Sequence, residues 1–170
     1  SARVQFDPIL RGSRLWWREG FAGPLLTCAG FPERCVPAGL EATFPATSFA
    51  GSEARLAWAN VFDDPATVYV CRADGVACPP RLIGRFSSGE VELAVDQHRV
   101  VWDALGPGGD LDIYFCEDDA HAGACPVQRL TASVTEQRNP EISGTRVVWE
   151  DDRDGETMIA GFELPSLDPV

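Results

Sequence analysis

The chain has 170 residues, a formal net charge of −12 at pH 7 and a hydrophobic fraction of 45%. This hydrophobic fraction is enough for a buried core and excludes a disordered chain. The negative charge excludes nucleic acid as a partner, because phosphate backbones repel it. No run of about 18 apolar residues is present, so we expect no membrane span.

The N-terminal region contains two short apolar runs, Ala2–Phe6 and Ile9–Gly12, ahead of a phrase that is repeated along the chain. The phrase ends in tryptophan, and its four copies are Arg14–Trp17, Arg55–Trp58, Arg99–Trp102 and Arg146–Trp149. Consecutive copies are offset by 41, 44 and 47 residues. A repeat of this period is the first feature that a fold prediction must explain.

Each copy of the phrase is followed, after a turn-forming stretch, by further apolar runs. The next runs of the four repeats are Pro24–Cys28, Val68–Cys71, Ile113–Cys116 and Met158–Phe162. The third runs are Gly39–Thr43, Arg81–Gly84 and Gln128–Thr131. The runs that precede the following phrase are Thr47–Gly51, Val91–Val95 and Pro140–Gly144. Short β-branched and aromatic runs bounded by Gly, Pro and Asp are typical of β-strands.

Four short strands in a repeat of about 44 residues are typical of a β-propeller blade. No longer segment shows a helical period. We therefore predict an all-β fold, a β-propeller of four blades with four antiparallel strands each, in one domain covering residues 1–170. The predicted repeats are 8–46, 47–90, 91–137 and 138–170.

The fourth repeat stops after its third strand, near Phe162–Pro165. We expect the N-terminal strand, residues 1–7, to complete the last blade and close the ring, which removes exposed sheet edges. Two alternatives remain open. The chain is half of an eight-bladed dimer, or it is a fragment of a larger propeller.

The third repeat carries the sequence motif best, with Arg99–Asp103 followed by Gly109 and by Asp112–Tyr114. This pattern resembles the TolB-like and WD-repeat-like propeller repeats of bacterial secreted and cell-surface proteins. The fourth repeat keeps the phrase but has Met158–Ala160 in place of Asp-Ile-Tyr. The resemblance implies a propeller scaffold for partners and no shared catalytic residues, because such scaffolds serve many functions.

The six cysteines follow the repeat, with one pair in each of the first three repeats. Each pair flanks the loop between two neighbouring strands, where facing residues lie within reach of a disulfide. Repeat symmetry therefore selects one pairing, namely Cys28–Cys35, Cys71–Cys78 and Cys116–Cys125. Because disulfides persist in oxidising compartments, we expect the protein to be secreted, periplasmic or at the cell surface.

Tryptophans repeated at one position are expected to pack between neighbouring sheets. Trp16 precedes Trp17 on an alternating strand, so one of these two indoles is expected to face outward as a contact surface. His98 occupies a variable position before the third phrase, and Asp103 and Asp110 belong to the polar stretch after it. Trp16, His98, Asp103 and Asp110 are the candidate ligand-binding residues.

The acidic stretch after the fourth phrase contains Asp151, Asp152 and Asp154. Calcium prefers several oxygen ligands from closely spaced carboxylates, so these three are the candidate metal ligands. A solvated acidic turn is the favoured interpretation, because Arg153 lies among them. We therefore expect no cofactor, with a weak calcium site as the alternative.

We predict a non-enzymatic recognition or scaffold module that binds a protein or a glycan through its propeller loops, as a monomer or a homodimer. Acidic loops favour cationic partners or calcium-bridged sugars. The alternative is a small polysaccharide-acting enzyme, a lyase or a hydrolase, with a carboxylate or histidine site in the channel. No Gly-x-Ser-x-Gly nucleophile motif is present.

Overall fold

The computed structural model describes residues 5–20, 23–40, 46–72, 78–87, 89–118 and 125–165. These described residues form fifteen strands and no helix, and none of them belongs to a helix that could cross a membrane. The strands are β1 (Gln5–Arg11), β2 (Arg14–Glu19), β3 (Leu25–Ala29), β4 (Ala38–Gly39), β5 (Ser48–Gly51), β6 (Arg55–Asn60), β7 (Ala66–Arg72), β8 (Arg81–Phe86), β9 (Leu93–Asp96), β10 (Arg99–Leu105), β11 (Leu111–Glu117), β12 (Gln128–Arg129), β13 (Gln137–Ser143), β14 (Arg146–Arg153) and β15 (Glu156–Glu163).

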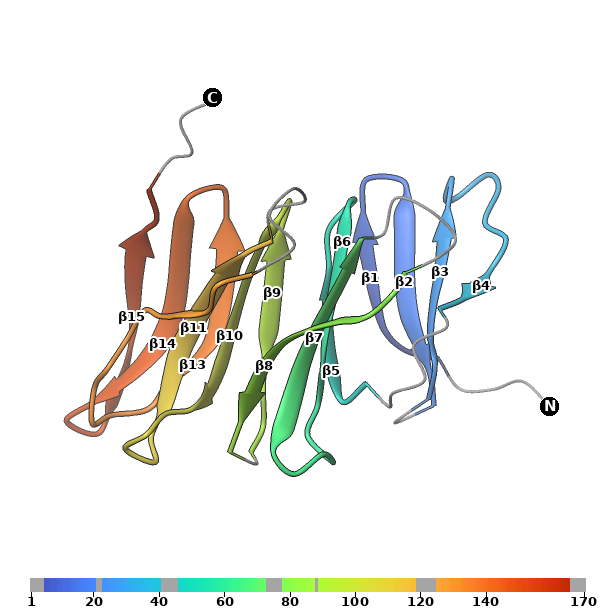
Figure 1. Ribbon diagram of the computed structural model, residues 1–170. Coiled ribbons are helices and arrows are strands. Elements are labelled where there is room, and N and C mark those ends of the chain that lie inside the picture. The colour runs from blue at the N-terminus through green and yellow to red at the C-terminus, as the bar shows by residue number, and fades with distance from the viewer. Residues whose placement is uncertain are drawn as a thin grey trace.

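The strands form four antiparallel sheets that follow one another in chain order (Figure 1). Sheet one is β1–β4, sheet two is β5–β8, sheet three is β9–β12 and sheet four is β13–β15. In each sheet, consecutive strands pair with their neighbours. The first strand of each sheet faces the interior of the arrangement, because β5 contacts β9 and β9 contacts β13.

The core consists of three apolar layers, each between two neighbouring sheets. Because side chains alternate along a strand, Val101 packs against sheet four, whereas its neighbour Trp102 packs against sheet two. Three of the four tryptophans that end the repeated phrase, Trp58, Trp102 and Trp149, lie in these layers, and Trp58 and Trp102 are fully buried. The predicted packing of the repeated tryptophans between neighbouring sheets is therefore confirmed for these three.

Trp16 and Trp17 are also both buried, with 1% and 5% of their surfaces exposed. The expectation that one of the two forms an outward contact surface is therefore wrong. For Trp16 the reason is sheet two, which covers the face of β2 that carries this side chain. The contact is so close that a Cβ atom on Gly51 would lie 2.8 Å from Trp16 Cδ1.

The expected closing strand is also wrong for the described part of residues 1–7. Gln5 and Phe6 pair with Glu19 and Arg18 in sheet one, not with sheet four. Residues 1–4 lie outside the described residues. A bulge at Asp7, with φ of 52°, lets β1 continue along β2, and such local pairing costs less chain entropy than pairing with the far end. Sheet four has three strands among the described residues.

Three disulfides connect the cysteines as predicted. The bridges are Cys28–Cys35, Cys71–Cys78 and Cys116–Cys125, with Cα–Cα distances of 5.1, 5.3 and 5.4 Å. In each pair the first cysteine lies in the third strand of its sheet, and the second lies just ahead of the fourth. The repeat therefore determined the pairing, because each bridge stays within its own sheet.

Candidate binding pocket at the hairpin end of the inner strands

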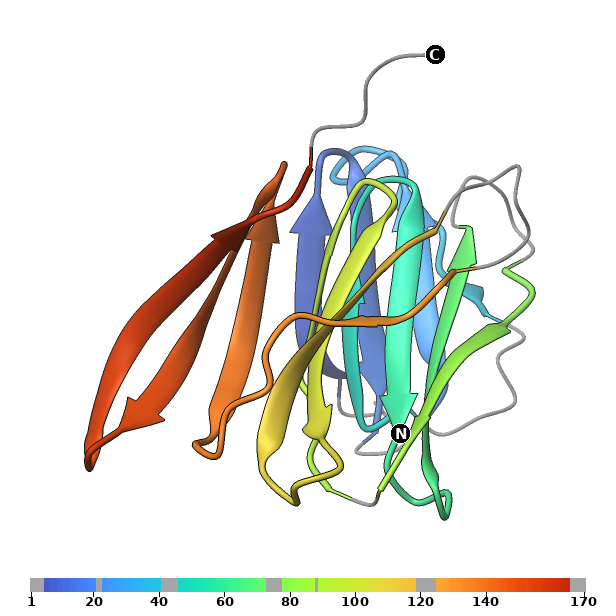
Figure 2. The same cartoon turned by 60° about the vertical axis from the view of Figure 1, so that its left-hand side comes forward.

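A pocket of about 760 Å³ lies where the first strands of all four sheets end. It is lined by the last residues of β1, β5, β9 and β13, and by the turns that lead from three of these strands to the next one. These turns lie at the upper end of the molecule in Figures 1 and 2. The pocket is therefore built jointly by residues far apart in the sequence.

Tight turns place these strand ends around the pocket. Gly12, Gln97 and Gly144 have φ values of 55°, 52° and 60° in the turns that follow β1, β9 and β13. Positive φ at the turn is what a short hairpin connection requires. The turn after β5 is held by the Ser52 hydroxyl, which accepts hydrogen bonds from the N–H groups of Ala54 and Arg55 at 3.4 and 3.1 Å.

The pocket has an apolar floor and an acidic rim. Phe49 and Val95 are buried lining residues. Glu53 and Glu141 line the same pocket and are exposed, and Asp96 adds a third carboxylate that accepts the Gly144 N–H. Three carboxylates in one concave site create a negative potential that attracts cations.

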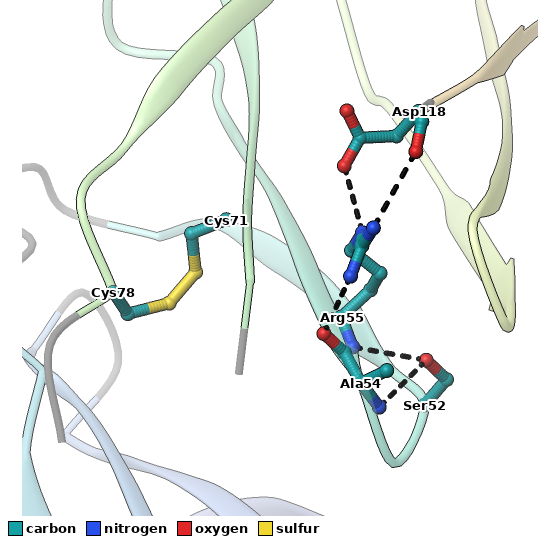
Figure 3. Close-up of a disulfide and its surroundings, with 6 residues drawn as sticks. All are labelled: Ser52, Ala54, Arg55, Cys71, Cys78 and Asp118. Atoms are coloured by element: carbon teal, nitrogen blue, oxygen red, sulfur yellow. Dashed lines mark hydrogen bonds and ion pairs between the residues drawn. A yellow bond between two sulfur atoms is a disulfide. The ribbon is translucent and has the colours of Figure 1, made fainter. Parts of the chain in front are cut away.

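The positive charges of the lining do not cancel this potential. Arg55 is buried, and its Nε donates to Asp118 Oδ2 at 2.7 Å (Figure 3). Arg81 contacts the other oxygen of the same carboxylate. Among the described residues that line the pocket, Arg11 is therefore the arginine that is exposed to solvent.

The Arg55–Asp118 contact also stiffens the pocket. It joins β6 of sheet two to the residue that follows β11 of sheet three. A charged hydrogen bond in a buried setting is stronger than in water. The turn that carries Glu53 is therefore held in place from both sides, by Ser52 and by the neighbouring sheet (Figure 3).

Of the four predicted ligand-binding residues, His98 is the one that lines the pocket. Its Nε2 lies 2.9 Å from Glu117 Oε1. The same oxygen accepts a hydrogen bond from Arg99 Nε at 3.1 Å. The imidazole is therefore oriented by the Glu117 carboxylate and is two-thirds buried.

The other three predicted residues lie elsewhere. Trp16 is in the layer between sheets one and two. Asp103 is buried and accepts the backbone N–H groups of Glu92 and Asn139 at 2.7 and 2.9 Å, and burial raises its pKa to about 6. Asp110 lies in the turn between β10 and β11, at the opposite end of β10 from His98. The structure does not bring these four residues together.

The three candidate calcium ligands do not converge either. Asp151 and Asp152 are neighbours on β14, so their side chains point to opposite faces of the sheet. Asp151 is buried and contacts Arg153 at 2.6 Å, whereas Asp152 contacts Arg138 at 2.9 Å. Asp154 is in the turn after β14, with φ of 54°. Among the residues that the structure describes, no group of three His, Cys, Asp or Glu could hold a metal ion.

Burial opposes ionisation of Asp151, but the hydrogen bond and charge of Arg153 outweigh it and lower the pKa of this carboxyl. The Asp151 carboxylate therefore forms an internal ion pair with Arg153.

Sequence analysis missed Glu53, Asp96 and Glu141, which form the acidic rim. A signal existed, because Glu53 and Asp96 lie within three residues of a repeated phrase and Glu141 lies within five. These three carboxylates come together only because the sheets that carry them are arranged around a common axis.

Comparison with known proteins supports the fold. No family model matches the chain, and no curated protein matches it. The putative TolB from Agrobacterium tumefaciens superposes with a TM-score of 0.67 at 15% identity, over 95% of this chain and 58% of that one. TolB from Acinetobacter baumannii superposes with a TM-score of 0.70 at 11% identity, over 95% of this chain and 41% of that one.

The WD40 domain of Toxoplasma gondii coronin superposes with a TM-score of 0.51 at 10% identity, over 90% of this chain and 44% of that one. The chain thus spans about half the length of these structures. Identities this low show the fold alone. The four sheets are four β-propeller blades, and the predicted likeness to TolB-like and WD-repeat-like repeats is confirmed.

Proposed function

We propose that the protein is a non-enzymatic recognition module that binds a positively charged segment of a partner protein in the pocket at the hairpin end. The supporting observation is the pocket of about 760 Å³, in which exposed Glu53 and Glu141 stand above buried Phe49 and Val95. A carboxylate rim selects guanidinium and ammonium groups, and the apolar floor accepts the aliphatic part of an arginine or lysine.

The proposed location of this module is outside the cytosol. Three disulfides fit an extracellular or periplasmic compartment, where such bonds persist. The rigid rim suits recognition of an extended segment, because a preorganised site loses less entropy on binding. Positively charged segments also reach a chain of net charge −12 faster at low ionic strength.

A blocked tripeptide, Arg-Ala-Arg with acetyl and amide ends, tests the proposal. We expect it to shift NMR resonances of pocket residues, with an affinity that falls as salt is added. The double variant Glu53→Gln/Glu141→Gln should weaken binding at least tenfold. The matched control, Asp154→Asn/Glu156→Gln, removes the same charge at the β14–β15 turn and should bind as the wild type does.

Two results would contradict the proposal. One is the absence of any shift at saturating peptide. The other is an equal loss of affinity in the two double variants, which would show that only the net charge of the chain attracts the peptide. The blocked Glu-Ala-Glu peptide serves as the ligand control and should not bind.

A second candidate, glycan binding, is supported by a smaller pocket of about 530 Å³ between sheets three and four. Hydroxyls of Ser133 and Thr135 line it together with Trp149, and the buried Gln137 Oε1 has no hydrogen-bond partner there. Hydroxyl groups of a sugar could supply that missing donor. A glycan array run with calcium and again with EDTA tests this candidate, and a blank array in both conditions removes it.

A further inference from the structure

Two of the four arginines that begin the repeated phrase, Arg55 and Arg99, reach from their own sheet into the next one. Arg55 of sheet two bonds Asp118, the residue after the third strand of sheet three. Arg99 of sheet three donates to the Gly144 and Pro165 carbonyls of sheet four, at 2.9 and 3.1 Å. Pro165 likewise follows the third strand of its sheet. The same repeat position therefore connects its sheet to the next one twice, once through a carboxylate and once through backbone carbonyls.

Apolar side chains also pack between sheets three and four, the two sheets that Arg99 connects. Val101 and Ile113 of sheet three are fully buried against sheet four, where they meet Val147 and Trp149. The pairing registers of β10 with β11 and of β14 with β15 place Val148 at the position of Val101. The same comparison places Ile159 at the position of Ile113, because each pairs with the residue after the phrase tryptophan.

On sheet four the same set of residues is uncovered. Arg146 is exposed, and 43% of Val148 and 73% of Ile159 are open to solvent. Figures 1 and 2 show no further sheet of the described chain beyond β14 and β15 on this side. The positions that the next sheet covers in sheet three are thus left uncovered on the outer face of sheet four. Val148 and Ile159 are the apolar part of this face, which also carries Glu150 and Asp152.

Sheet one presents the opposite half of such an inter-sheet contact, at the other end of the row of sheets (Figure 1). Leu15 and Leu26 occupy the positions at which Val100 and Tyr114 of sheet three face the preceding sheet. Both leucines are half-buried, and Leu10, which pairs with Leu15, is 47% exposed, whereas Trp17, which pairs with Leu26 on this face, is buried. One chain therefore carries both halves of the contact.

We propose that the outer face of sheet four binds sheet one of a second copy of this chain, in the manner in which consecutive sheets bind within the chain. The contact is head-to-tail, because different surfaces of the two copies meet. Two copies that make it twice form a closed ring of eight sheets. This inference is independent of the proposed peptide pocket, which the peptide titration tests separately.

Sedimentation and light scattering of the disulfide-intact protein across a range of concentrations test the proposal. We expect a mass that moves from 18.4 kDa to twice this value as the concentration rises. High salt should favour the dimer, because copies with a net charge of −12 repel each other. A monomer at every concentration and salt level would overturn the proposal.

Variants identify the surfaces. Ile159→Glu places a charge on the outer face of sheet four and should yield a monomer, whereas Met158→Glu, on the opposite face of the same strand, should still dimerise. Leu10→Glu should yield a monomer by disabling sheet one. Near-ultraviolet circular dichroism checks that each variant keeps its tryptophan packing.

Mixing the two monomeric variants separates a head-to-tail contact from a face-to-face one. The Ile159→Glu copy keeps an intact sheet one, and the Leu10→Glu copy keeps an intact sheet four. A mixture should therefore recover a dimer through one good contact. A mixture that stays monomeric, or a dimer that survives Ile159→Glu, would show that other surfaces associate.

Discussion

Asp103 accepts a hydrogen bond from the backbone N–H of Asn139 at 2.9 Å, and this bond joins sheet three to sheet four. The other carboxylate oxygen accepts the N–H of Glu92 at 2.7 Å. The side chain is buried, and burial raises its pKa to about 6 even though both hydrogen bonds lower it. The fold therefore favours the protonated form of a carboxyl that would ionise near pH 4 in the unfolded chain.

This shift gives a pH dependence of stability with a defined sign. Because the folded pKa lies above the unfolded one, the contribution of Asp103 to stability is complete below about pH 4 and is lost as the pH rises through 6. The loss amounts to about 3 kcal/mol. In Asp103→Asn this loss should be absent. The free energy of unfolding, measured with urea from about pH 4 to about pH 8, should therefore vary less with pH in the variant than in the wild type.

The control for this experiment is Asp154→Asn, which changes an exposed turn residue. Its profile should run parallel to the wild-type profile. Parallel profiles for the wild type and Asp103→Asn would instead show that the buried carboxylate ionises at its ordinary pKa.

The buried ion pair of Arg55 and Asp118 should matter more for stability than the exposed ion pairs of sheet four. Arg55→Ala leaves the buried carboxylate with Arg81 as its remaining cation, so we expect a loss of about 2–4 kcal/mol in the free energy of unfolding. Arg138→Ala removes a half-exposed partner of Glu150 and Asp152 and should cost less than about 1 kcal/mol. Equal costs in chemical denaturation would refute this ranking.

Repeated local features were predictable from the sequence. The phrase ending in tryptophan located one strand of each sheet, and its period identified the blades. The pairing of Cys71 with Cys78 followed from the same register, because a bridge within one hairpin depends on neighbouring residues alone. Such features need no knowledge of how the sheets pack.

Features that depend on neighbouring sheets were not predictable. Trp16 was expected at a surface, yet sheet two covers it. His98 was placed among four candidates, and it alone lines the pocket, because its partners in that site come from other sheets. The rim carboxylates Glu53, Asp96 and Glu141 each lie near a repeated phrase, but their convergence was not predictable, since Glu53 and Glu141 are 88 positions apart in the chain.

The contact between Trp16 and Gly51 makes a testable case of this inter-sheet packing. A Cβ atom on Gly51 would approach Trp16 Cδ1 and Nε1 to 2.8 and 2.9 Å. We expect Gly51→Ala to lower the free energy of unfolding by about 1–3 kcal/mol. In a Trp16→Ala background the same change should cost less, because the indole atoms that the added Cβ would meet are absent. A double-mutant cycle by urea unfolding measures the difference, and full additivity would show that the two residues do not interact.

The disulfides of sheets one and two provide the last test, because they close loops of equal length. The paired cysteines of Cys28–Cys35 and of Cys71–Cys78 are each seven positions apart. In the chain-entropy model, removing either bridge should cost about 2–3 kcal/mol. Any further difference between the two must come from packing.

Packing should make the second bridge the more costly to remove. Cys71 and Cys78 are both buried in the layer between sheets one and two, whereas Cys35 is half-exposed. Replacing Cys71 and Cys78 by alanine leaves a cavity in that layer, for which we expect about 1–2 kcal/mol beyond the loss seen for Cys28→Ala/Cys35→Ala. Thermal and urea unfolding of the two double variants measure this difference. If the two variants are equally stable, the second bridge acts only through the loop that it closes.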